Sequence, residues 1–225
     1  MWTPFLIIYG PLFQTDILKI LQPVFQSDFN GIIKNDFSYK RIRDLILKSP
    51  EASLIYIWPY LKNELSNNHH LAKTHNYANL LNAMLENLNL LKTQELENSK
   101  LKAYKTDVLP FIYKLIIKQL QHQPADILDS TYFSSTVNKL INVLPAALVE
   151  KSIWKILGPF YSTNFLNIIE NKYAAVTMIE LIEKSRDLNQ NDLMPKMISN
   201  LILKAISTSP NFFLENEARS FSSSY

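Results

Sequence analysis

The chain has 225 residues, no cysteine, only three glycines and a formal net charge of +3. Without cysteine, neither a disulfide framework nor a cysteine-ligated zinc site can form. Because Gly10, Gly31 and Gly158 are isolated, a glycine-rich phosphate-binding loop is excluded as well. Hydrophobic residues make up 47% of the chain, enough for a large core, and the shortage of glycine favours helices over sheets.

The first thirteen residues are apolar, but Pro4, Gly10 and Pro11 interrupt them. They lack the basic region and the small-residue cleavage site of a signal peptide. They are also shorter than the roughly 18 residues that a membrane span needs. We therefore expect a first core helix here, no transmembrane segment, and an intracellular protein of the cytoplasm or nucleus that is not secreted.

Helical spacing of apolar residues dominates the chain from residue 36 onward. Residues 39–46 place Tyr39, Ile42, Leu45 and Ile46 on one face of a helix, with Asp36 and Ser38 before them as candidate caps. The longest uninterrupted pattern runs from residue 70 to residue 93. After a polar stretch, Thr106-Asp107 is expected to cap the next helix.

The second half of the chain has the same character. Pro145 is expected to open a helix that Gly158-Pro159 stops, and Asn191-Asp192 to cap the last long one. No strand pattern competes. We predict an all-α fold of about nine or ten helices in antiparallel hairpins. It forms a single domain over residues 1–219, with a subdivision near 94–102 as an option and a disordered tail at 220–225.

A short phrase recurs along the chain: two apolar residues followed by a proline near a helix start. It occurs at Pro110, Pro145 and Pro195, with a looser copy at Pro59, and successive prolines lie 35 to 51 residues apart. HEAT and armadillo repeats have periods of about 40–47 residues. Residues 36–208 therefore resemble helical-repeat proteins of this type, which implies a short α-solenoid. An irregular helical bundle stays open, because proline also favours the first helical turn for local reasons.

The residues that could perform catalysis form no recognisable motif. The four histidines, His69, His70, His75 and His122, include no His-Glu-x-x-His pair, and a metal site needs three or four convergent ligands. The strained Gly-x-Ser-x-Gly turn of a hydrolase cannot be built from isolated glycines. We expect no catalytic, cofactor or metal site, and we interpret the first three histidines as part of a solvated helix N-terminus.

Basic side chains give the strongest remaining functional signal, and they form two groups. The first group is Lys40, Arg41, Arg43 and Lys48; the second is Lys100, Lys102, Lys105, Lys114 and Lys118. Tyrosines lie among them, and aromatic side chains stack on the bases of single-stranded nucleic acid. The groups are either the ordinary charged faces of amphipathic helices or a nucleic-acid-binding surface.

Aromatic residues near the two ends of the sequence, Trp2, Phe212 and Phe213, are candidate anchors for an interface, where aromatic residues are enriched. We predict a non-enzymatic protein–protein interaction module, a subunit or scaffold of a larger intracellular complex whose partners are other protein subunits. The alternative is a helical-repeat protein that binds RNA or DNA through its basic helix faces.

Overall fold

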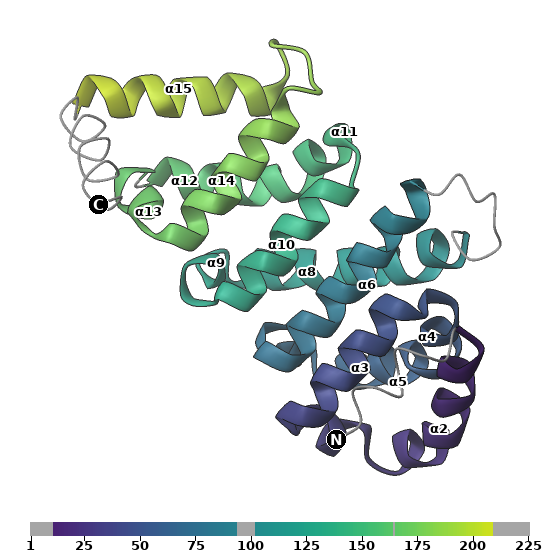
Figure 1. Ribbon diagram of the computed structural model, residues 1–225. Coiled ribbons are helices and arrows are strands. Elements are labelled where there is room, and N and C mark those ends of the chain that lie inside the picture. Colours follow the sequence, from purple (N-terminus) through teal and green to yellow (C-terminus); the bar gives the residue numbers. More distant parts are fainter. Residues whose placement is uncertain (1–10, 94–101, 164, 209–225) are drawn as a thin grey trace, which may run out of the picture.

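The computed structural model describes residues 11–93, 102–163 and 165–208, and within these ranges the protein has no strand (Figure 1). Ten α-helices of seven or more residues lie in the described ranges, which confirms the predicted all-α class and helix number. They are α2 (Pro11–Lys34), α3 (Asp36–Lys48), α4 (Pro50–Tyr56), α5 (Trp58–Asn67), α6 (His75–Thr93), α8 (Leu109–His122), α10 (Thr131–Val143), α12 (Lys155–Thr163), α14 (Lys172–Ser185) and α15 (Leu193–Thr208).

Shorter helical elements connect them. They are the 3-10 helix η1 (His69–Lys73), the π-helical turns η2 (Tyr104–Val108) and η3 (Glu150–Trp154), and the short helices α9 (Asp126–Asp129), α11 (Ala146–Val149) and α13 (Phe165–Glu170). Most of the expected first helix and of the optional subdivision, and all of the expected tail, lie outside the described residues.

Four helices form a first layer in which each packs against the next, in the order α3, α6, α10 and α14 (Figure 1). Each neighbouring pair is in contact near its N-terminal ends and again near its C-terminal ends. The contacts are Tyr39–His75 and Asn87–Ile46 for α3 and α6, His75–Tyr132 and Lys139–Glu86 for α6 and α10, and Tyr173–Thr131 and Lys184–Asn142 for α10 and α14. The four helices therefore run in the same direction.

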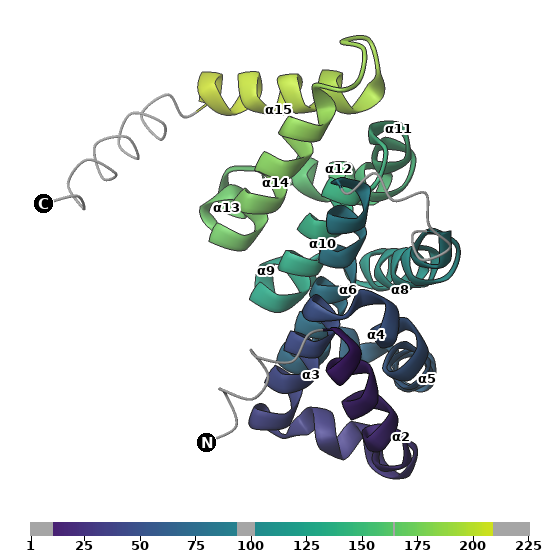
Figure 2. The ribbon, with the colours of Figure 1, turned by 45° about the vertical axis from the view of Figure 1, so that its right-hand side comes forward.

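The other long helices lie beside this layer or at its two ends (Figure 2). The chain segments that connect the first-layer helices include α5, α8 and α12. Helix α8 packs against η1, η3 and α12, and α15, the last described helix, packs on α12 and α14. Each repeated proline stands at the N-cap or within the first three residues of a helix outside the first layer: Pro59 in α5, Pro110 in α8, Pro145 at α11 and Pro195 in α15.

The core follows the helical spacing of the sequence. Tyr39, Ile42, Leu45 and Ile46 are all buried, as their common face requires, and buried residues from Leu18 to Leu201 form one hydrophobic cluster. Burial of such side chains is the main source of stability for packed helices.

A polar network is enclosed in this core between α6 and the start of α4. The Asn87 side chain is fully buried, and its Nδ2 donates to the Ile46 carbonyl at 2.8 Å and to the Tyr104 hydroxyl at 3.0 Å. That hydroxyl lies 3.1 Å from the Pro50 carbonyl, to which it donates, and 3.2 Å from Ser53 Oγ. Buried polar groups are costly unless they are bonded, so the network specifies how α3, α4 and α6 fit together.

The expected stop at Gly158-Pro159 is wrong, because the helix continues through both residues to Thr163. Gly158 is buried, and a Cβ atom placed there would lie 2.9 Å from Cε2 of the buried Trp154 side chain. The glycine thus lets an indole ring lie against the helix backbone. The π-helical turn η3 directly precedes this stretch, and both π-helical turns and prolines are places where helices bend.

The predicted cap at Thr106-Asp107 is also wrong, because helical structure is already present at residue 102. Thr106 Oγ1 donates to the Lys102 carbonyl within the helical turn, and Asp107 accepts hydrogen bonds from Trp58 and Lys62. The long pattern over 70–93 is divided, with η1 ending at Lys73 and α6 beginning at His75. Asp107 looks like a helix cap in the sequence, but in the structure its carboxylate binds Trp58 and Lys62 of another helix.

Candidate interaction surfaces

A row of side chains crosses the first layer near the N-terminal ends of its helices. The Tyr39 hydroxyl lies 3.2 Å from His75 Nε2, and the His75 ring lies 4.4 Å from the Tyr132 ring, centroid to centroid. Next along the layer, a hydrogen bond with Thr131 lowers the pKa of Tyr173. Burial raises the pKa of Tyr39, and the nearby Asp36 carboxylate raises it further, so Tyr39 stays protonated and able to donate. We call Tyr39, His75, Tyr132 and Tyr173 the aromatic row.

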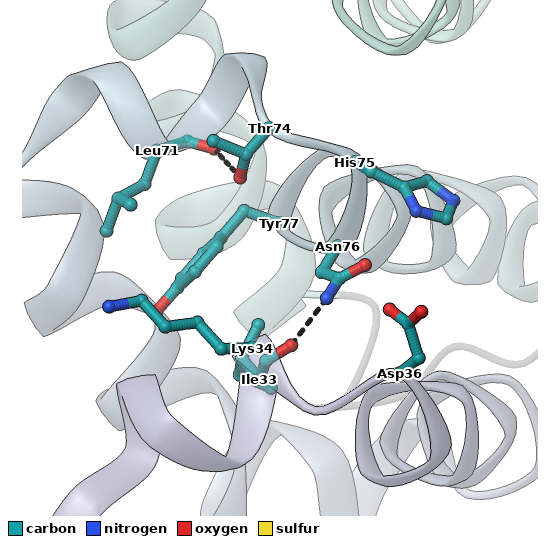
Figure 3. A pocket seen from close by; sticks show the side chains of 8 residues that line it. All are labelled: Ile33, Lys34, Asp36, Leu71, Thr74, His75, Asn76 and Tyr77. Atoms are coloured by element: carbon teal, nitrogen blue, oxygen red, sulfur yellow. Dashed lines mark hydrogen bonds between the residues drawn. The ribbon is translucent and has the colours of Figure 1, made fainter.

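A pocket of about 310 Å³ adjoins the row where α2 meets α3 and η1 meets α6 (Figure 3). Its lining residues are Ile33, Lys34, Asp36, Leu71, Thr74, His75, Asn76 and Tyr77. Figure 3 shows the Asp36 carboxylate turned toward the side chains of His75 and Asn76, with Lys34 extending away from them.

The polar groups of this pocket are largely occupied by the fold. Thr74 Oγ1 donates to the Leu71 carbonyl at 2.7 Å, and Asn76 Nδ2 donates to the Ile33 carbonyl at 2.7 Å (Figure 3). The Tyr77 hydroxyl donates to Asn30 at 3.1 Å. These three side chains are bonded to two backbone carbonyls and to the Asn30 side chain, so their polar atoms do not converge on a point inside the pocket. The arrangement suits reception of a partner's side chain better than proton transfer.

Large apolar side chains are exposed on the outer helices of the same layer. Phe37 on α3 is 65% exposed, and the Arg41 guanidinium stands 5.1 Å from its ring centre. On α14, Val176 and Ile179 are 47% and 54% exposed. Tyr132 of the aromatic row is exposed between them on α10. Scattered apolar residues are normal on a protein surface, and others are exposed on α2, α4, α11 and α15, but these four share one layer of parallel helices.

The two basic groups predicted from the sequence lie on different layers. Lys40 and Lys48 are exposed and Arg41 and Arg43 half-buried on α3, while Lys102, Lys105, Lys114 and Lys118 are exposed on the helical run that ends in α8. In Figure 2, α8 lies beside α6 on the side away from α3. The structure therefore does not join the two groups into one surface. Lys100 and the candidate anchors Trp2, Phe212 and Phe213 lie outside the described residues.

The three histidines that we interpreted as a solvated helix N-terminus begin two helices: His69 and His70 stand at the start of η1 and His75 at the start of α6, and His70 and His75 are exposed. His75 belongs to the aromatic row, whereas the His69 and His70 rings lie 4.4 Å apart, close to Lys118 and His122 of α8. Partial burial lowers the pKa of His69, and the positive charges of His70, Lys118, His122 and Lys73 lower it further. A signal for this cluster was present in the sequence, since residues 65–85 and 108–125 contain no acidic residue.

Among the described residues, no group of three or more histidine, aspartate or glutamate side chains could hold a metal ion. No helix in these ranges has the length and apolarity needed to cross a membrane. No protein-family model, curated protein or solved structure matches this chain. Its function must therefore be argued from its own surfaces.

Proposed function

We propose that this chain is a non-enzymatic protein–protein interaction module, a scaffold or subunit of an intracellular complex, that binds its partner across the first helical layer. The observation that carries the proposal is the aromatic row beside a pocket of about 310 Å³: His75 and Tyr132 are exposed and Tyr173 is half-buried, while the buried Tyr39 hydroxyl holds His75. Aromatic residues are enriched at protein interfaces because they offer large contact areas at low entropic cost.

The layered arrangement supports a helical-repeat architecture of the HEAT or armadillo kind, as the resemblance in sequence implies. The first-layer helices begin at residues 36, 75, 131 and 172, and two of the three intervals, 39 and 41 residues, are close to such a period. Arrays of this kind present an extended face to peptides and helices.

The environment of His75 supports binding over catalysis. Its Nε2 is in hydrogen-bond contact with Tyr39, and its ring lies against Tyr132, so the fold holds the imidazole in place on two sides. A general base needs a free nitrogen within reach of the substrate, and a nucleophile beside it. The two hydroxyls of the pocket, on Thr74 and Tyr77, donate to the Leu71 carbonyl and to the Asn30 side chain.

The test compares proteins that co-purify with wild type and with variants of the first-layer face, quantified by mass spectrometry from source-cell extract. Phe37→Ser and Tyr132→Ser remove exposed apolar surface from this face and should deplete specific partners at least tenfold. Ile20→Ser and Ile55→Ser are matched controls, because these apolar side chains are also strongly exposed, 74% and 58%, but lie on α2 and α4. Equal depletion by both pairs, or by neither, would contradict the proposal, with circular dichroism verifying that all variants fold.

A further inference from the structure

The surface formed by η1 and α8 is one-sidedly basic. His70, Lys114, Lys118 and His122 are exposed, and His69 is half-buried beside them. We call these five residues the histidine–lysine surface. The charged neighbours that shift the pKa of His69 are all cationic: His70, Lys118, His122 and Lys73. Positive charges held together in this way repel one another unless a polyanion neutralises them.

Carboxylates on the elements around this surface are already engaged elsewhere. Asp107 accepts from Lys62 at 2.6 Å and from Trp58 at 2.8 Å, and Glu150 on η3 accepts from the Met194 backbone N–H at 2.8 Å. The nearly buried Asp126 carboxylate of α9 forms an ion pair with Lys73.

The remaining neighbours do not compensate the charge either. The charge of Glu64 on α5 raises the pKa of Tyr77 but is not among the charges that shift the pKa of His69. His75, at the start of α6, is in hydrogen-bond contact with Tyr39 in the aromatic row. The facing groups of η1 and α8 are therefore left with a net positive field.

Geometry favours a regular chain of negative charges as the ligand. Lys114, Lys118 and His122 are spaced four residues apart on α8, so they rise on one side of the helix at intervals of about 6 Å. This is on the order of the separation of successive phosphates along an extended nucleic-acid strand. Gln119 Nε2 donates to the His69 carbonyl at 3.2 Å and fixes η1 against α8, which holds the two rows of cations together.

Among the described residues of η1 and α8, the histidine–lysine surface has no strongly exposed apolar side chain, which favours a nucleic acid over an acidic protein as its ligand. Within the described residues, the strongly exposed large hydrophobic side chains lie on other elements, and none is on η1 or α8. A protein interface needs a desolvated apolar centre, whereas phosphate contacts do not. We propose that the histidine–lysine surface binds the phosphate backbone of single-stranded nucleic acid without sequence preference. This site is separate from the proposed protein-binding face and does not depend on it.

Fluorescence anisotropy of the full chain with a labelled mixed-sequence single-stranded oligodeoxynucleotide tests this site. With Lys114 and Lys118 each contacting one phosphate, raising salt from about 50 to about 200 mM at pH 7.5 should weaken binding about 7-fold, since each single-strand phosphate contact contributes a slope of about −0.7.

Matched variants locate the effect. Lys114→Gln with Lys118→Gln should weaken binding and lower its dependence on salt concentration. Lys40→Gln with Lys48→Gln makes the same change of charge on α3 and should have less than a twofold effect.

Three results would overturn the proposal. The first is no binding at pH 7.5 in about 50 mM salt. The second is equal weakening by the α3 and α8 lysine pairs, which would indicate a response to net charge alone. The third is displacement of the oligonucleotide by poly-glutamate of equal charge at equal concentration, which would assign the surface to acidic proteins.

Discussion

Replacing Gly158 by alanine should destabilise the protein, although alanine normally stabilises a helix. The helix preference of alanine over glycine is worth about 1 kcal/mol. Against it stands the new Cβ atom, which would lie 2.9 Å from Cε2 and 3.2 Å from Cζ2 and Nε1 of Trp154. Contacts this short force the ring or the backbone to move, and Trp154 is only 1% exposed, so the ring has no free space to enter. Overpacking of a core costs about 1–3 kcal/mol.

The two effects together give a net loss of up to about 2 kcal/mol in the free energy of unfolding for Gly158→Ala. In a chain of this size each kcal/mol shifts Tm by about 2–4 °C, so the variant should melt up to about 8 °C below wild type. Urea titration and thermal scans followed by far-ultraviolet circular dichroism measure both quantities.

A double-mutant cycle identifies the indole as the cause. In a Trp154→Phe background the short contacts disappear, so Gly158→Ala should become neutral or stabilising by up to about 1 kcal/mol. The reasoning is refuted if Gly158→Ala stabilises the wild-type chain, or if its cost is the same in both backgrounds.

Three further changes test other parts of the structure. Tyr104→Phe removes the hydroxyl that Asn87 bonds in the core and should cost about 1–3 kcal/mol by urea titration; a loss below 0.5 kcal/mol would show that the network is not needed. Asn171→Ala removes the cap of α14 and should cost about 1–2 kcal/mol, and an unchanged urea midpoint would contradict that role. Burial raises the pKa of Asp107, but hydrogen bonds from Lys62 and an indole outweigh it and hold the pKa below its ordinary value. Its contribution is therefore complete above about pH 4 and is lost as pH falls through the lowered pKa, so Lys62→Met should lose less stability than wild type between pH 5 and pH 2.5; equal losses would refute this.

Local patterns predicted the helices well because a helix is decided by residues three and four positions apart. The face made by Tyr39, Ile42, Leu45 and Ile46 is buried as its spacing requires. Local reasoning failed at Gly158, where the residue that resembles a terminator is required by an indole packed against the helix. Terminators and close-packing glycines look the same in a sequence, and only the neighbouring side chain distinguishes them.

The candidate surfaces could be predicted only in part. The lysines of α8 were found as a charge group, but their neighbours His69 and His70 lie more than forty residues earlier in the chain. The contact between His75 and Tyr132 depends on how α6 and α10 align, and no local pattern encodes that register. Conversely, the sequence suggested the two basic groups together as one candidate nucleic-acid-binding surface, whereas the structure places them on different helical layers. Surfaces assembled from separate helices follow from tertiary packing and need the structure.

The parallel helices α3, α6, α10 and α14 also have a mechanical consequence. Each packs on its immediate neighbours, so a force applied between the two ends of the layer passes through three interfaces in series. Compliances in series add, and a small rotation at each interface accumulates into a larger bend of the whole layer. The aromatic row crosses all three interfaces on one edge, so its spacing widens or narrows as the layer flexes. A rigid ligand that bound along that edge would therefore fix the curvature of the layer as well as fill the binding surface.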